Sequence, residues 1–178
     1  MVDELARRQS IDFESAPVDA LVAKWRRSDV ASGFGRTADE LVLIAKPLTF
    51  MNDSGQAVGA LIRYFRIDVS DLLIVVDEVQ LPLGRLRARV RGSAGGHNGL
   101  KSVIAHVGEE FARLRIGVGR GDSQRDLADH VLARFDADEA GEAERMTTRA
   151  ADAAETFITA GIAAVMNAYN GGDQATTE

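Results

Sequence analysis

The sequence predicts an α/β fold: a single domain of three α/β/α layers around a mixed, largely parallel sheet. Two short apolar runs, residues 41–45 and 72–76, have the length and composition of strands covered on both faces. Between these runs and after them, apolar residues recur at the i, i+3, i+4 and i+7 spacing of a helix with one buried face. Strands that alternate with helices in this order are typical of sheets with parallel strands.

The remaining elements follow from the same periodicities. Residues 111–118 are a third, less apolar strand candidate, and helices are predicted over residues 58–65, 100–107 and 146–157. The chain opens in an amphipathic helical pattern over residues 1–6, whereas a domain of this kind more often opens with a strand. Domains that open with a helix also exist, so this pattern alone does not show that a first strand is missing. Residues 171–178 predict a disordered tail, which leaves residues 1–170 as the domain.

The composition excludes several classes of site. The 178-residue chain has no cysteine, which rules out disulfides, thiol catalysis and cysteine-ligated metals. Its three histidines, His97, His106 and His130, lack the spacing of metal ligands. No apolar run reaches the roughly 18 residues that span a bilayer. Because the net charge is −6, any contact with nucleic acid must come from a local basic patch.

Three polar segments follow predicted strands or open predicted helices. Residues 46–55 follow the first strand, at the sheet edge where open α/β sheets bind ligands. There Asn52 is either a binding residue or turn chemistry, while Asp53 or Ser54 can cap the next helix. Asp77 and Glu78 end the second strand, where two carboxylates can orient a base or bind a metal, or can simply be solvated.

The third segment, residues 92–101, is a glycine-rich loop that leads into a helix. Such loops bring backbone N–H groups close to a ligand, but the spacing excludes a Walker loop. Within it, His97 and Asn98 are either site residues or, respectively, a structural hydrogen bonder and a helix cap. The sequence alone does not separate these two interpretations.

A basic stripe is predicted at residues 85–91, where arginine alternates with apolar residues. The period of two places Leu86, Ala88 and Val90 on one strand face. The opposite face carries Arg85, Arg87, Arg89 and Arg91. Four like charges on one face require a counter-charge, which is either a phosphate backbone or the acids of a neighbouring strand.

Together and in this order, the motifs resemble the bacterial-type peptidyl-tRNA hydrolase family. Its pattern KPxT(F/Y)MNxSG is matched within residues 46–55, and its strand ending in two acids is matched at residues 77–78. Its GGHNGLKS is matched without a gap at residues 95–102, and its FxRLRIGxGR at residues 111–120. The segment at residues 166–170 also resembles the family's end. The match covers residues 1–170.

The resemblance implies hydrolysis of the ester that joins a peptide to the 3′ ribose of tRNA, in the recycling of tRNA and ribosome rescue during translation. It implies that a histidine activates water and that Asp77 orients this general base. The implied substrate-binding residues are Phe50, Asn52, His97 and Asn98. The residues expected to meet tRNA phosphates are Arg87, Arg89, Lys101 and Arg115.

The chain also departs from the family's pattern. The family begins with a strand, a Gly-Leu-Gly-Asn-Pro-Gly turn and an Arg-His-Asn segment that carries the general base, and the sequence contains none of these. Val76, Gln80 and Gly121 stand where the family has His, Asp and Pro. An enzyme that lacks its N-terminal segment is one interpretation, and a catalytically inactive tRNA- or RNA-binding relative is the alternative. An unrelated α/β binding domain is a third interpretation, which the number of matched motifs makes remote.

The resemblance further implies no cofactor and no metal, with peptidyl-tRNA as the partner. We expect a cytoplasmic monomer that makes no contact with a membrane. The absence of cysteine suits a reducing compartment.

Overall fold

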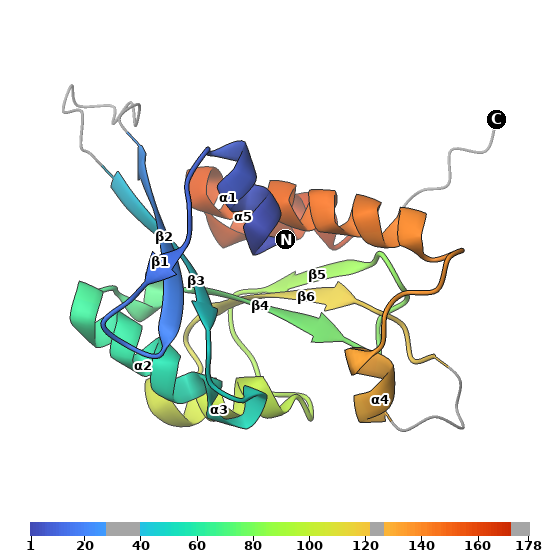
Figure 1. Cartoon of the computed structure of the whole chain (residues 1–178), viewed down its shortest axis with the longest axis horizontal. Coiled ribbons are helices and arrows are strands. Elements are labelled where there is room, and N and C mark those ends of the chain that lie inside the picture. Colours follow the sequence, from blue (N-terminus) through green and yellow to red (C-terminus); the bar gives the residue numbers. More distant parts are fainter. Residues whose placement is uncertain (28–39, 122–126, 172–178) are drawn as a thin grey trace. The chain divides into compact units, whose positions relative to one another are not determined.

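The computed structural model describes residues 1–27, 40–121 and 127–171. The chain forms two compact units: Met1–Arg66 with Asn98–Val107, and Ile67–His97 with Gly108–Glu178. Figure 1 shows their helices and strands. Of the predicted tail at residues 171–178, all but Gly171 lies outside the described residues. A single domain over residues 1–170 stays a prediction.

The first unit combines an antiparallel sheet with three helices. Its elements are α1 (Val2–Arg8), β1 (Glu14–Ser15), β2 (Ala20–Arg27), β3 (Glu40–Pro47), η1 (Met51–Asp53), α2 (Ser54–Phe65) and α3 (Asn98–Val107). The strand order is β1-β2-β3, and β2 and β3 pair along their whole length, from Ala20 opposite Pro47 to Arg27 opposite Glu40. Ala20, Val22 and Leu61 form one apolar cluster of its core, together with partly buried Leu43 and Phe65.

The second unit is built around the strand predicted at residues 111–118. Its elements are η2 (Val69–Asp71), β4 (Leu73–Glu78), β5 (Leu86–Arg89), β6 (Ala112–Gly117), α4 (Leu127–Leu132) and α5 (Ala140–Tyr169). Strand β6 is central: β4 pairs with it in parallel and β5 in antiparallel. Helix α5 packs against β5 and β6, and Gly161 breaks it with a positive φ of 76°.

The α/β fold predicted from the sequence is confirmed, but its parallel character is smaller than expected. Among the described residues only β4 and β6 pair in parallel. The expectation that residues 41–45 and 72–76 are covered on both faces is also wrong. Leu41 is 43% exposed, because β3 lies in an antiparallel sheet that needs cover on one face only. Every residue of β4 is partly exposed, and its one strand neighbour in the described chain is β6.

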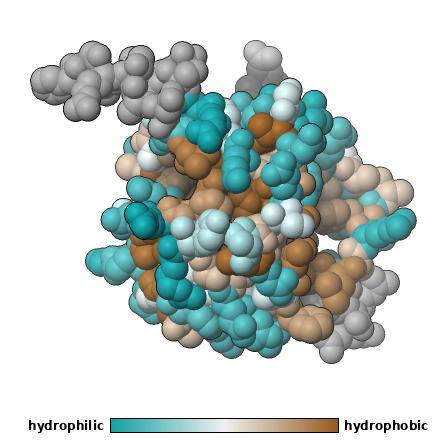
Figure 2. All heavy atoms as spheres, turned by 60° about the vertical axis from the view of Figure 1, so that its left-hand side comes forward, coloured by the Kyte–Doolittle hydropathy of each residue, from teal (hydrophilic) through white to brown (hydrophobic). Residues whose placement is uncertain are grey.

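The buried face of β5 agrees with the predicted alternation. Leu86 and Ala88 are fully buried, whereas Arg87 and Arg89 are exposed. Val90 was predicted to share the face of Leu86 and Ala88, but the strand ends at Arg89 and Val90 is 51% exposed. Other large apolar side chains are exposed as well, including Leu48 and Phe50. On the face shown in Figure 2, hydrophobic residues are interspersed among hydrophilic ones.

Close packing of α2 on α3 explains a glycine in the first motif. The backbone N–H of Gly55 donates a hydrogen bond to Oγ of Ser102 over 3.0 Å. This bond caps the start of α2, where the expected caps do not act: the Asp53 side chain accepts no capping bond, and Ser54 Oγ donates to the carbonyl of Met51. A β-carbon on Gly55 would lie 2.1 Å from the Ser102 carbonyl oxygen. The helices can approach this closely only because residue 55 has no side chain.

Gly55→Ala should therefore destabilise the protein, by about 1–3 kcal/mol or more, because backbone atoms of α3 would have to move. Gly59→Ala is the matched control on the same helix. Its β-carbon would come no closer than 3.3 Å, to the flexible end of Arg63, and alanine favours a helix. Urea unfolding of the two variants measures the difference. Equal stabilities would contradict the packing argument.

Candidate functional site

Two consecutive acids at the end of β4 contact different partners. Asp77 accepts a hydrogen bond from Nε2 of His97 over 3.4 Å, and Glu78 pairs with Arg115 over 2.5 Å. Successive side chains of a strand point to opposite faces, so the two acids meet different partners on the two faces of the sheet. Asp77 and Glu78 were predicted to contribute to a site, and they form an acid–imidazole pair and an acid–guanidinium pair, respectively.

The acid–imidazole pair is partly buried. The side chains of His97 and Asp77 are 15% and 30% exposed. The hydrogen bond from His97 is the main reason why the pKa of the Asp77 carboxyl is lowered below its ordinary value, and it outweighs the raising effect of burial. Asp77 therefore stays ionised beside an imidazole, which is the arrangement that orients a histidine and stabilises its protonated form.

Glycines bring His97 to this position. Gly95 and Gly96 have φ values of 58° and 91°, which residues with a β-carbon rarely adopt. A β-carbon on Gly95 would also lie 3.0 Å from Nη1 of Arg115. The backbone N–H of His97 then closes a turn onto the Ala94 carbonyl. The glycine-rich loop thus lies against a guanidinium and presents an imidazole to Asp77.

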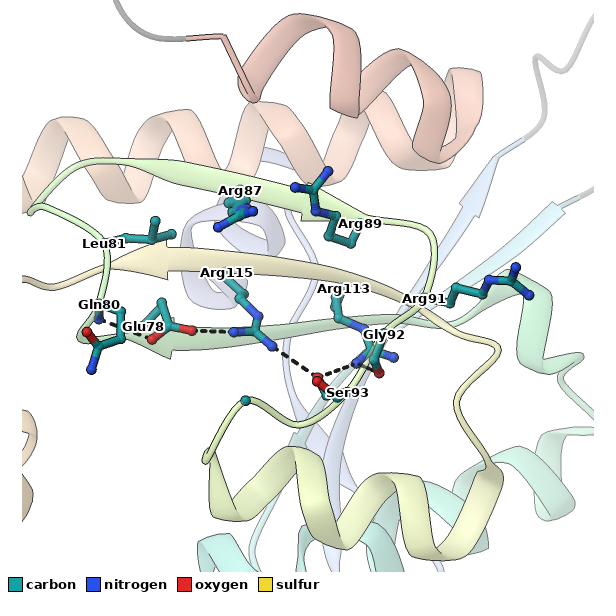
Figure 3. A pocket seen from close by; sticks show the side chains of 11 residues that line it. Glu78, Gln80, Leu81, Arg87, Arg89, Arg91, Gly92, Ser93, Arg113 and Arg115 are labelled. Atoms are coloured by element: carbon teal, nitrogen blue, oxygen red, sulfur yellow. Dashed lines mark hydrogen bonds and ion pairs between the residues drawn. The ribbon is translucent and has the colours of Figure 1, made fainter.

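Beside Glu78 lies a cleft of about 310 Å³ whose lining includes five arginines, and Figure 3 shows its side chains. The register of β5 and β6 accounts for it, because Arg87 lies opposite Arg115 and Arg89 opposite Arg113. The lining residues are Glu78, Gln80, Leu81, Arg87, Arg89, Arg91, Gly92, Ser93, Gly95, Arg113 and Arg115. The predicted basic stripe is thus widened by two arginines of the neighbouring strand.

The arginines of the cleft differ in how their charge is compensated. Arg115 is bound by Glu78 and also donates to the Ser93 carbonyl over 3.1 Å. Arg91 reaches Glu110 in an exposed pair of 3.4 Å. Within the described part of the chain, no acid pairs with Arg87 or Arg89. These two exposed guanidinium groups carry the charge that an anionic ligand can neutralise.

Arg113 is the site residue that sequence reasoning missed. It is 1% exposed and donates to the carbonyls of Gly92, Ser93 and Glu109, while its guanidinium stacks on Phe111 at 4.3 Å. Burial lowers its pKa. Strand alternation predicts only the side of the sheet on which a residue lies. It cannot show that Arg113 is buried, or that its partners among the described residues are backbone carbonyls and not a carboxylate. Arg113 holds the loop that leads to His97.

The remaining predicted site residues belong to the first unit. Phe50 is 82% exposed, Asn52 lies in η1, and Asn98 is the first residue of α3, as predicted. Segment η1 packs on α3, so the two amides come from neighbouring elements. Lys101 donates to Oδ1 of Asn98 over 3.4 Å. Convergence of Asn52 and Asn98 on one pocket stays a prediction.

Similarity to known proteins identifies the family. The sequence matches the family model described as peptidyl-tRNA hydrolase over residues 1–177. The chain belongs to the peptidyl-tRNA hydrolase family. A peptidyl-tRNA hydrolase of Lachnospira eligens is 39% identical over 172 residues, which are 96% of this chain and 87% of the relative. One of Symbiobacterium thermophilum is 43% identical over 171 residues, 96% of this chain and 86% of the relative.

A solved structure of the same family has a similar fold. A mutant peptidyl-tRNA hydrolase from Acinetobacter baumannii is similar with a TM-score of 0.82 and 27% sequence identity, covering 95% of this chain and 82% of that chain. The resemblance predicted from the motifs is confirmed, and with it the α/β fold and the hydrolase class. Among the helices of the described residues, none is long and apolar enough to cross a membrane.

The Asp77–His97 pair predicts a pH dependence of stability. A lowered carboxyl pKa stabilises the fold above the ordinary aspartate pKa of about 3.9, and this stabilisation is lost as pH falls through the lowered pKa. Asp77→Asn should therefore cost stability at pH 6, and the cost should shrink as the pH drops below about 3.9. Urea unfolding of both proteins across this range measures it.

His97→Gln supplies the control for this measurement. Once the imidazole is gone, Asp77→Asn should have a smaller effect, because the main cause of the lowered pKa is removed. A difference between wild type and Asp77→Asn that is constant with pH, or unchanged by His97→Gln, would contradict the pairing.

Proposed function

We propose that this chain acts on peptidyl-tRNA, hydrolysing the ester between the peptide and the 3′ ribose, with Asp77 orienting an imidazole and the arginine cleft binding tRNA phosphates. The observation that carries the proposal is the end of β4, where Asp77 contacts an imidazole and Glu78 contacts the cleft. One rigid strand end thereby links the group needed for ester hydrolysis to the group needed for a polyanionic substrate.

The chemistry requires a water molecule, a base and an orienting acid. The base takes a proton from water as its oxygen attacks the ester carbonyl, and the proton is returned to the departing 3′ oxygen. The products are the peptide carboxylic acid and tRNA with a free 3′ hydroxyl. An ionised Asp77 stabilises the imidazolium that forms in between, in line with its lowered pKa.

The resemblance assigns the base to a histidine of the family's N-terminal segment and assigns His97 to substrate binding. In this chain the imidazole that contacts Asp77 is that of His97. We propose that Asp77 is the orienting acid in either case. Variants of His97 in the 178-residue chain, and in a form extended upstream by the family's segment, then test which residue is the base.

The cleft supplies the contacts to tRNA. Arg87 and Arg89 are exposed and have no acid partner among the described residues, so they bind phosphate without first breaking an ion pair. The guanidinium of Arg115 already donates to Glu78 and to the Ser93 carbonyl. We therefore propose that Arg115 contributes less to phosphate binding than Arg87 and Arg89 do. Lys101, Phe50, Asn52 and Asn98 remain proposed contacts to the tRNA end or the peptide.

We place the protein in the cytoplasm as a monomer that recycles tRNA from stalled translation and needs neither cofactor nor metal. Ester hydrolysis by an oriented base requires none. The alternative, an RNA-binding relative without catalysis, predicts the same tRNA affinity and no turnover.

Replacing Arg87 and Arg89 by alanine should weaken tRNA binding and reduce the slope of log affinity against log salt by about 1 for each phosphate that the protein no longer neutralises. The double variant Arg26→Ala/Arg63→Ala removes the same charge from exposed positions on β2 and α2 and should leave the slope unchanged. Filter binding of deacylated tRNA over a salt series measures both. Equal slopes for the two double variants would remove the cleft from the binding site.

Asp77→Asn should lower turnover of peptidyl-tRNA about 100-fold or more while tRNA binding persists, because the imidazole loses its orienting acid. Hydrolysis is measured in the 178-residue chain and in the extended form. If the 178-residue chain is inactive and the extension restores turnover, the base lies in the added segment. If the 178-residue chain is active, His97→Gln should abolish turnover. His106→Gln is the control, since His106 contacts the Ser102 carbonyl. Full activity of Asp77→Asn would contradict the proposed role.

A further inference from the structure

The side chain of Asn170, the residue that follows helix α5, binds the backbone of strand β5. Oδ1 of Asn170 accepts a hydrogen bond from the backbone N–H of Ala88 over 2.6 Å, and its Nδ2 donates to the backbone carbonyl of Ala88 over 3.0 Å. The backbone carbonyl of Asn170 also accepts a bond from Arg85 over 3.0 Å. Three bonds thus attach the helix end to β5 and to the residue before it, more than eighty residues earlier in the chain.

The two bonds between Ala88 and the Asn170 amide replace those that a neighbouring strand would make. In an antiparallel ladder, alternate residues direct both backbone groups to the partner strand, and the residues between them direct both groups away. Both groups of Ala88 go to Asn170, so the edge of β5 away from β6 is closed there by an amide instead of a strand. A primary amide has both the donor and the acceptor of a peptide group, whereas aspartate has only acceptors and alanine has neither.

The position of the contact matters for the cleft. Ala88 lies between Arg87 and Arg89 and is fully buried, so holding its backbone fixes the direction of both neighbouring side chains. The strand has only four residues, and each of these two arginines faces another arginine across the ladder. Like charges opposite one another repel, which favours loosening of the strand unless its far edge is anchored.

We propose that Asn170 is a positioning residue for the cleft: it holds Arg87 and Arg89 in the geometry that binds RNA phosphates, without contacting the RNA itself. The proposal rests on the proposed function of the cleft. It also gives a role to the segment at residues 166–170, which the site described above does not use.

Asn170→Ala should weaken binding of deacylated tRNA roughly tenfold and reduce the salt slope by about 1, as expected when one fewer phosphate is neutralised. Asn170→Asp, which keeps the size and the acceptor but loses the donor, should fall between Asn170→Ala and wild type. Asn167→Ala is the matched control, because Asn167 is exposed on the same helix. The salt slope is the decisive readout: a purely structural defect lowers the fraction of active protein, which shifts the affinity line without changing its slope.

The outcomes separate this proposal from the function on which it rests. If Arg87→Ala/Arg89→Ala reduces the slope and both Asn170 variants leave it unchanged, Asn170 has no positioning role. If the arginine variant itself has a normal slope, the cleft is not the tRNA site. Adding Asn170→Ala to the arginine variant should cause no further change in slope, because the positioned groups are gone. Loss of cooperative unfolding in both Asn170 variants would also overturn the proposal, since the residue would then support the fold as a whole.

Discussion

The pairing of β6 with two different neighbours is the constraint on which the rest of the second unit depends. Parallel pairing with β4 brings the acids at residues 77 and 78 alongside Ile116 and Gly117, and antiparallel pairing with β5 sets two arginines opposite two others. A shift of one residue in either register would turn every side chain to the other face. The position of β6 therefore decides both the acid pair and the basic cleft.

Four arginines on one face of a two-strand ladder repel one another, and their charges are compensated in different ways. Arg115 has a carboxylate, Arg113 has backbone carbonyls and an aromatic ring, and the two on β5 face solvent. Burial makes an unpaired charge costly, whereas water screens an exposed one. The compensated pair consequently holds the loop and the strand end in place, and the uncompensated pair is left for a ligand.

Much of this could be predicted from the residues, because it depends on local periodicity. The period of two at residues 85–91 predicted which side chains of β5 share a face, and the glycine-rich loop predicted the helix that begins at Asn98. The expected caps of α2 failed because the hydroxyl that caps it comes from Ser102, 47 residues later in the chain. The expected burial of β4 failed because an apolar composition does not say how many neighbours a strand has.

By itself, the sequence determined the family, the α/β class and the types of residue in the site, since motifs and periodicities are properties of neighbouring residues. Only the tertiary structure decided that Asp77 contacts His97, that Arg115 is already paired with Glu78, that Arg113 is buried beneath the loop, and that Asn170 closes the edge of β5. Each of these pairs residues about 20 to more than 80 positions apart. Such contacts arise from strand register and helix packing, which no local pattern encodes.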